Sequence, residues 1–265
     1  MNTHGIFGFI LKYNFWLVLP QDTYTFKRLT NGSQVRNFIL LFFICCIFTK
    51  LSQAQQLIIS IPNADITPKN EYVFTGESQL KLEKERGTEN FLFGTYGVGY
   101  NTELALSAYN IKVPRSSVNA SVAPGFKTSV QIFRERLDKL QLKLTGGQMI
   151  PLSFNGKEVG SWTYGHLSLR LPALDTRLTG GANFGTRQIF GRSQFSFLTG
   201  VEQPITEKLM FVADWVSGTH QFAALAVGLQ SHINRDTAIL VAYKLPNNTL
   251  SGERAIIFEI VKHFR

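Results

Sequence analysis

Cysteine is nearly absent from this chain of 265 residues, and the two present, Cys45 and Cys46, are neighbours in one apolar run near the N-terminus. If that run is removed as a leader, the remaining chain has no disulfide, no thiolate metal site and no cysteine nucleophile. Charged residues are also few, at 17% of the chain against 44% hydrophobic residues. This composition excludes a disordered protein, which combines high charge with low hydrophobicity.

The positive charge lacks the distribution that nucleic acid binding requires. The formal net charge is +9, from 27 Lys and Arg against 18 Asp and Glu. Residues 1–54 hold five of the bases and one of the acids, and the remaining excess is scattered without a basic run. A nucleic-acid surface gathers its Lys and Arg on one face or along one helix. We therefore expect no nucleic acid partner.

No apolar run is long enough to cross a bilayer as a helix. The run at residues 38–48 follows Arg36 and has eleven residues, whereas a transmembrane helix needs about 20. Two small residues, Ser52 and Ala54, then stand at positions −3 and −1 of a cut before Gln55. A basic residue, a short apolar run and such a site are typical of a secretory signal peptide. The sequence therefore predicts an exported protein.

Helical periodicity is missing after the leader, and alternation takes its place. In residues 166–171, leucines alternate with His166, Ser168 and Arg170. A period of two is the pattern of a β-strand with one apolar and one polar face. Residues 131–142 come nearest to a helical pattern. We expect an extended loop there, with a charged hairpin tip or one helical turn over residues 134–139 as the alternatives. About twelve strands are predicted, near residues 71–83, 90–100, 102–113, 118–134, 138–150, 160–171, 175–186, 193–203, 208–218, 221–232, 237–245 and 253–264.

Two all-β architectures bury such strands: a soluble sandwich or barrel with a polar outside, and a transmembrane barrel with a polar inside. The export signal, the lack of cysteine and the near-continuous succession of hairpins favour the transmembrane barrel. Aromatic residues near the segment ends are expected to form its interfacial girdles. They are Tyr72, Phe91, Tyr100, Tyr109, Phe133, Phe154, Trp162, Tyr164, Phe184, Phe190, Trp215, Phe222, Tyr243 and Phe264.

The chain ends in a pattern that is typical of one protein family. Residues 255–265 alternate, and Phe258, Ile260 and Phe264 fall on one face. This ending is similar to the C-terminal membrane-insertion strand of bacterial outer-membrane β-barrel proteins of the small, porin-like kind, although here Arg265 follows the aromatic residue. The resemblance is architectural, covers roughly residues 57–265 and brings no catalytic motif.

The resemblance implies an all-β fold, an antiparallel up-and-down transmembrane β-barrel of about 12 strands in the outer membrane. It also implies contact with outer-membrane lipid, insertion by the barrel-assembly machinery, and a role as a passive channel for small solutes or as a structural membrane protein. We expect a leader with its signal peptide over residues 1–54, an extended segment over 55–70 and the barrel domain over 71–265. No cofactor is implied, and no pattern encodes the oligomeric state.

Polar residues that alternate with the apolar ones are expected to face the lumen. Basic residues outnumber acidic ones among them, which predicts an anion-preferring or weakly selective pore. Alternatively, the lumenal acids and bases pair with one another and fill the interior. The predicted lumen-lining residues are Glu77, Lys81, Lys143, His166, Arg170, Arg177 and Glu259.

Two further functions stay open. A soluble secreted β-sandwich that binds a ligand would place the leucines in its core. An outer-membrane lipid-modifying enzyme would need a nucleophile and a base within hydrogen-bond reach, and the nearest pairs are His166 with Ser168 and Ser217 with His220. Spacing implies no third, orienting residue for either pair, so we expect no catalytic site. The five histidines show no metal-ligand spacing, so no metal site is expected either.

Overall fold

The computed structural model describes residues 57–83, 87–113, 121–133, 138–153 and 159–265. The predicted leader over residues 1–54, with both cysteines, lies outside the described residues. The described chain is almost entirely β-strand. The strands are β1 (Tyr72–Lys81), β2 (Thr88–Gly99), β3 (Thr102–Val113), β4 (Ser121–Gln131), β5 (Lys143–Met149), β6 (Leu152–Ser153), β7 (Trp162–Leu171), β8 (Thr176–Gly185), β9 (Phe195–Pro204), β10 (Leu209–Val216), β11 (Ala224–Asn234), β12 (Thr237–Pro246) and β13 (Ala255–Phe264).

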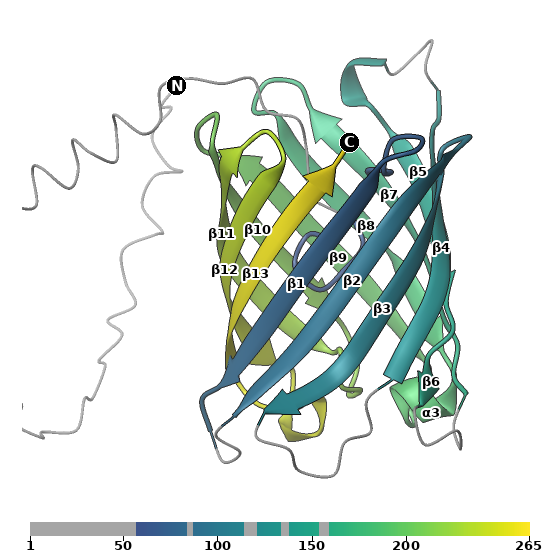
Figure 1. Cartoon of the computed structure of the whole chain (residues 1–265), viewed down its shortest axis with the longest axis vertical. Helices are drawn as coiled ribbons and strands as arrows, with labels where there is room; N and C mark the ends of the chain where they lie inside the picture. The colour runs from purple at the N-terminus through teal and green to yellow at the C-terminus, as the bar shows by residue number, and fades with distance from the viewer. Residues whose placement is uncertain (1–56, 84–86, 114–120, 134–137, 154–158) are drawn as a thin grey trace, which may run out of the picture. The chain divides into compact units, whose positions relative to one another are not determined.

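The strands form one sheet that closes on itself (Figure 1). Neighbouring strands pair antiparallel, and the pairing of β1 with β13 completes the ring. β5 and β6 both pair with β4 and form one strand interrupted at residues 150–151, because Pro151 has no N–H to donate. The ring therefore has twelve strands, and the predicted antiparallel barrel of about 12 strands is confirmed.

Side chains alternate between the inside and the outside of the ring, as successive residues of a strand do. In β7, His166 and Ser168 are buried, whereas Leu167 between them is 46% exposed. In β13, Phe258 and Ile260 are likewise about half exposed on the outer face. Large apolar side chains thus cover the outside. The alternative of a sandwich with these leucines in its core is wrong, because they point away from the interior.

The two ends of the barrel differ in the length of their connections. We call the end that holds the C-terminus, at the top of Figure 1, the turn end and the opposite one the loop end. Four of the five turn-end connections have two to four residues, whereas those of the loop end have six to nine. The turn-end connections are residues 100–101, 132–142, 172–175, 205–208 and 235–236, and the loop-end connections are residues 82–87, 114–120, 154–161, 186–194, 217–223 and 247–254.

Short helical turns occur in the connections. Residues 131–142, expected to be an extended loop, contain the 3₁₀ turn η1 (Asp138–Leu140), so that prediction was wrong there. α3 (Arg187–Phe190) is too short to show a period in the sequence, and it ends at Gly191, whose φ of 61° glycine adopts without strain. η2 (Thr249–Ser251) precedes β13. Among the described residues, no helix is long and apolar enough to cross a membrane.

Six aromatic residues expected in the interfacial girdles lie inside the barrel instead. Two of them, Phe91 and Tyr109, line an interior cavity. Trp162 and Tyr164 share the inward positions of β7, and Trp162 stacks on Phe222 with ring centroids 5.6 Å apart. Phe190 is 1% exposed. Whether an aromatic side chain points into the barrel or toward the outside depends on its place in the alternation along the strand. Its distance from the end of the strand does not decide this. The exposed aromatic residues include Tyr72, Tyr100, Phe184, Trp215, Tyr243 and Phe264.

Candidate functional site: the barrel interior

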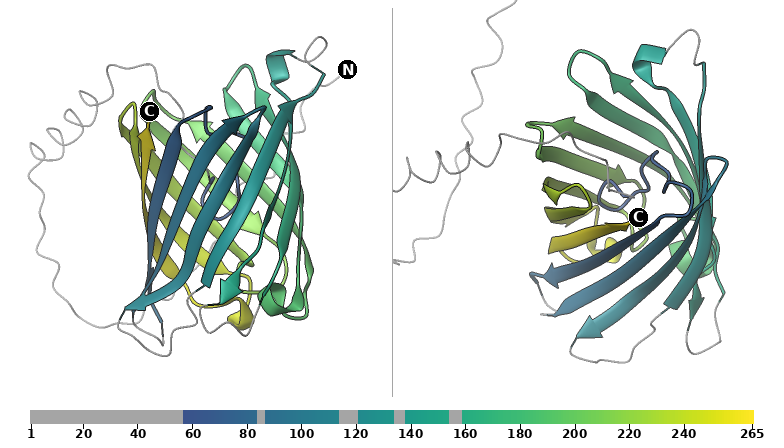
Figure 2. Two further views of the ribbon diagram at one scale, coloured as in Figure 1. Left: turned by 45° about the vertical axis from the view of Figure 1, so that its right-hand side comes forward. Right: turned by 45° about the horizontal axis from the view of Figure 1, so that its top comes forward.

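Residues 57–70, which we call the inner segment, lie inside the ring of strands (Figure 2). From the sequence we expected residues 55–70 only to lead into the barrel as an extended segment. The described part bends at its start, where Leu57 bridges Pro62 and the N–H of Ile58 donates to the carbonyl of Ile61 at 2.8 Å. It then runs to the first residue of β1. The chain thus fills part of its own lumen.

Three isoleucines of the inner segment are buried against one wall of the barrel. Ile58, Ile59 and Ile61 are at most 1% exposed. Full burial of one such side chain is worth about 1.5–3 kcal/mol, so the three contribute about 5 kcal/mol or more. Without them, an apolar patch of the inner wall would face water. That patch consists of Leu198, Val212, Ala226, Leu240 and Ile257, from β9 to β13.

A buried carboxylate on β10 holds the same part of the inner segment. Asp214 Oδ2 accepts hydrogen bonds from three successive backbone N–H groups, those of Ile59 at 2.9 Å, Ser60 at 2.5 Å and Ile61 at 3.0 Å. Successive backbone N–H groups that converge on one point form an anion-binding concavity. Asp214 is 2% exposed, and a buried charge is stable only with such partners. This contact fixes the bend of the inner segment.

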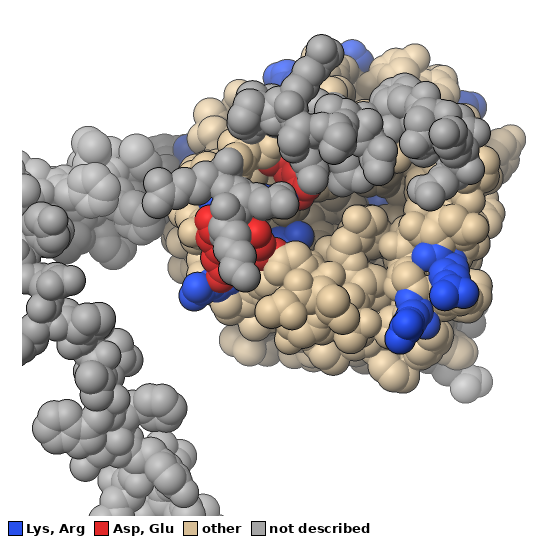
Figure 3. Space-filling model, turned by 90° about the horizontal axis from the view of Figure 1, so that it is seen from below, with Lys and Arg blue, Asp and Glu red and all other residues tan. Residues whose placement is uncertain are grey.

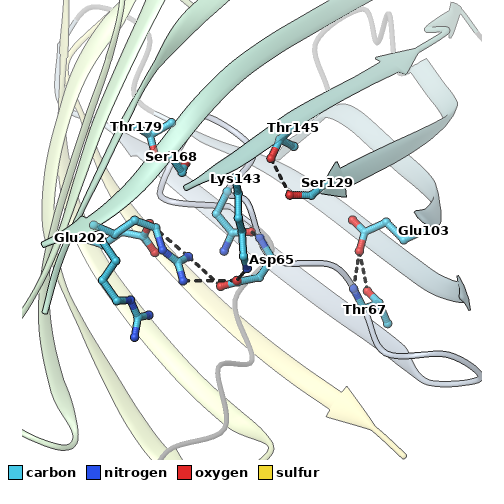
Figure 4. A network of polar contacts seen from close by, with 12 residues as sticks. Asp65, Thr67, Glu103, Ser129, Lys143, Thr145, Ser168, Thr179 and Glu202 are labelled. Atoms are coloured by element: carbon cyan, nitrogen blue, oxygen red, sulfur yellow. Dashed lines mark hydrogen bonds and ion pairs between the residues drawn. The ribbon is translucent and has the colours of Figure 1, made fainter. Parts of the chain in front are cut away.

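A second carboxylate, on the inner segment itself, binds two basic residues of the wall (Figure 4). Asp65 accepts from Arg177 Nη1 at 2.7 Å and from Lys143 Nζ at 2.8 Å. Burial by itself raises the pKa of Asp65, but the positive charges of Arg177 and Lys143 outweigh burial, so that its pKa lies below the ordinary value. Asp65 is therefore ionised at neutral pH.

A third contact, between Thr67 and Glu103, holds the inner segment close to the start of β1. The N–H and the hydroxyl of Thr67 donate to Glu103 Oε2 at 2.7 and 2.8 Å, and Lys127 pairs with the other oxygen of Glu103 at 3.0 Å. The inner segment then crosses β2 at Gly97, where a Cβ atom would lie 2.0 Å from the carbonyl oxygen of Pro68. Only glycine permits this approach of the two backbones.

Two cavities lie on either side of the inner segment. The first, of about 250 Å³, lies toward the loop end, and Ser60 and Glu253 contribute to its lining. The second, of about 540 Å³, lies toward the turn end, and Asn63, Asp65 and Lys208 contribute to its lining. In Figure 3, which looks at the loop end, acidic and basic side chains lie beside one another at the edge of the barrel. The inner segment separates the two cavities.

Three of the basic residues expected in the lumen lie together at the turn-end cavity. Lys143, Arg170 and Arg177 all line it. Arg170 pairs with Asp175 of the β7–β8 turn at 3.1 Å. Lys143 and Arg177 meet at Asp65, as described above. The structure therefore brings two of the expected lumen residues together around one carboxylate.

The remaining expected lumen residues lie in other places. Glu77 and Lys81 line the loop-end cavity, and Lys81 pairs with Glu89 at 3.5 Å. Glu259 stands opposite Glu77 in the β1–β13 ladder and is 3% exposed. His166 is 1% exposed on β7 and belongs to neither group.

Sequence reasoning missed the residues that hold the inner segment. Asp65, Thr67 and Glu103 are ordinary polar residues whose partners lie far away in the chain. Asp214 carried a signal, because it is the one acidic residue in the apolar strand β10. An acid at an inward position between Val212 and Val216 needs a partner inside the barrel.

The two serine–histidine pairs considered from the sequence, His166 with Ser168 and Ser217 with His220, form no hydrogen bond of nucleophile to base among the described residues. Ser168 Oγ shares a hydrogen bond with Thr179 at 2.7 Å, and Ser217 Oγ accepts the N–H of Phe197. His220 instead meets Ser196 Oγ at 2.8 Å, and that hydroxyl donates to Asn183 Oδ1. A serine whose proton is already donated to an amide oxygen does not donate it to the histidine.

His220 also has the wrong tautomer for a base toward Ser196. Its Nδ1 accepts the N–H of Phe222 at 3.2 Å, which leaves the proton on Nε2. Burial lowers the pKa of His220 to about 4. Among the described residues, no group of three or more His, Cys, Asp or Glu is arranged to hold a metal ion.

No protein-family model matches this chain, and no curated protein matches it. Among solved structures, the KdgM porin is 9% identical, with 74% of this chain and 99% of the porin covered and a TM-score of 0.49. An outer membrane channel from Pseudomonas putida F1 is 9% identical, with 76% and 98% covered and a TM-score of 0.45. The translocator domain of the autotransporter NalP from Neisseria meningitidis is 13% identical, with 76% and 90% covered and a TM-score of 0.43.

These likenesses concern the barrel architecture. At such identities and scores they carry no solute and no activity over to this chain. Its barrel is established by its own strand pairings.

Proposed function

We propose that this protein is an outer-membrane β-barrel that gives small solutes a passive path, and that the inner segment closes this path. The observation that carries the proposal is the arrangement of the two cavities. They measure about 250 and 540 Å³, lie toward opposite ends of the barrel and are separated by the inner segment.

The outer membrane is the environment that suits the outer face. In hydrocarbon every backbone N–H and C=O must be paired internally, and a closed ring of strands meets this condition. About 9 to 11 tilted residues cross the core, and β1, β7, β8, β9, β12 and β13 each have ten. Short turns face the periplasm and longer loops the outside in such barrels, so we expect the turn end to face the periplasm.

Export and insertion belong to the same proposal. The leader over residues 1–54 would direct export, and the barrel-assembly machinery would insert the barrel. The last strand, β13, presents Phe258, Ile260 and Phe264 outward, each about half exposed. Outer-membrane lipid would contact these side chains.

The inner segment can leave without breaking the barrel. Its only ladder contact with a strand of the ring, among the described residues, is the isolated bridge between Lys69 and Gly97. The anchors at Asp214, Arg177, Lys143 and Glu103 are side chains of the wall. The ladder pairings of the twelve strands with one another do not involve the inner segment. The path for solutes is then the polar lumen.

Liposome swelling tests the proposal. Two chains are compared, one that starts at Gln55 and one that starts at Lys69, and a heat-modifiability gel first shows that both are folded. We expect liposomes with the shorter chain to admit a small neutral solute such as arabinose much faster than liposomes with the longer chain. If both folded chains leave the liposomes impermeable, the protein is not a channel and a structural role remains.

A further inference from the structure

Lys143 and Arg177 hold one carboxylate from two sides. Arg177 donates through Nη1 and Nη2 to the two oxygens of Asp65, at 2.7 and 3.3 Å, and Lys143 Nζ donates to Oδ1 at 2.8 Å. A guanidinium fork that faces both oxygens is the geometry in which arginine recognises carboxylates. The two bases stand on β5 and β8, which both pair with β7 in the ring, whereas Asp65 belongs to the inner segment. Lys143 and Arg177 thus belong to the wall of the barrel, and the Asp65 carboxylate lies between them.

The site is reached from the turn end. The side chain of Lys143 is 28% exposed and that of Asp65 is 16% exposed. Both line the turn-end cavity of about 540 Å³, together with Arg177. A solute of a few non-hydrogen atoms therefore fits beside them without passing the inner segment.

The local charges favour an anion once Asp65 leaves. Arg177 Nη1 also lies 3.5 Å from Glu202 Oε2, which is nearly buried. With Asp65 in place, the two bases face two carboxylates. Arg170 and Asp175 line the same cavity, but they pair with each other and add no net charge. Without Asp65, the charges of Lys143, Arg177 and Glu202 therefore leave an excess of one positive charge. A single carboxylate restores the balance.

We propose that Lys143 and Arg177 form a binding site for the carboxylate group of small organic acids, and that such a solute displaces Asp65 and so promotes opening of the path. This inference rests on the proposed function and names the solute class. A tethered group competes with an effective concentration on the order of millimolar. Organic acids therefore compete with Asp65 at millimolar concentrations and above.

The experiment uses the mature chain in planar lipid bilayers, with sodium acetate exchanged for sodium chloride at constant ionic strength on each side in turn. We expect acetate on the turn-end side to raise the open probability about tenfold, the effect of losing one charge-assisted anchor. Lys143→Gln should open more often at the start and lose the response to acetate. The control is Lys262→Gln, the same change on β13, where Lys262 contacts Thr237; it should keep the response.

A second measurement does not depend on conduction. In Asp65→Ala the site is vacant, and acetate should raise the temperature of heat modification in detergent by about 2–4 °C relative to chloride. Adding Lys143→Gln to Asp65→Ala should abolish this shift. Channels that open equally in acetate and chloride, together with no thermal shift, would overturn the carboxylate site and leave the proposed function intact. A thermal shift in barrels that never conduct would instead uphold the site and refute the channel.

Discussion

Asparagine in place of Asp214 removes one negative charge and keeps the size of the side chain. In the native barrel, the charged oxygen accepts three backbone N–H groups of the inner segment, at 2.5 to 3.0 Å. Hydrogen bonds to a charged group contribute about 1.5–3 kcal/mol each, against about 0.5–1.5 kcal/mol for neutral ones. The loss over three bonds is therefore about 3 kcal/mol. Since 1.4 kcal/mol is a factor of ten, the population with a displaced inner segment should rise roughly 100-fold.

Single-channel recording measures this change as an open probability. Asp214→Asn should open far more often than the native chain, with the same conductance when open, because the strands are untouched. Asp236→Asn is the matched control, since Asp236 lies in the β11–β12 turn and pairs with Arg265 at 3.3 Å, away from the inner segment. If Asp214→Asn and Asp236→Asn both behave like the native chain, Asp214 does not hold a closed state and the reasoning fails.

Three further predictions concern Gly97, Asp65 and His220. Gly97→Ala should displace the inner segment and raise the open probability, because the new Cβ would lie 2.0 Å from the Pro68 carbonyl oxygen, whereas Gly180→Ala, with nothing within 4 Å, should not. The pKa of Asp65 lies below its ordinary value of 3.8, so the stability that ionised Asp65 gives to the closed state is complete above that pH and is lost only in stronger acid. Protonation of Asp65 should therefore not change the open probability between pH 5 and 7. A change of open probability in this range that Asp65→Asn removes would contradict this. Burial lowers the pKa of His220 from 6.5 to about 4, so the unfolded chain binds this proton more readily than the folded barrel does. The temperature of heat modification should therefore fall as the pH drops from 6.5 toward 4. It should fall less in His220→Gln.

The ring of strands could be predicted because each strand carries its own signal. Alternation with period two is local, and it located β7 and β13 to within two residues. The inner segment has no such signal. Its contacts join residues far apart in the chain, 112 positions between Asp65 and Arg177 and 155 between Ile59 and Asp214. Spacing within one segment cannot report such contacts.

One feature of the sequence did point to a filled interior. In β13 both Ile256 and Ile257 are apolar, although they lie on opposite faces, and Val261 shares the inner face with Ile257. An inner wall that faced only water would not need such residues. Ile257 is 0% exposed because the isoleucines of the inner segment belong to the same cluster. Apolar residues on both faces of a barrel strand therefore indicate that something covers the inner one.

A reversible lock of the inner segment tests the central claim most directly. A Cβ atom at Gly200 would lie 2.5 Å from the end of the Ile58 side chain, so cysteines at these two positions are placed to form a disulfide. No other cysteine interferes, since Cys45 and Cys46 lie in the predicted leader. We expect the oxidised Ile58→Cys, Gly200→Cys barrel to stay closed in a bilayer and to open once a reductant is added. Equal conduction by the oxidised and reduced barrels would contradict closure by the inner segment.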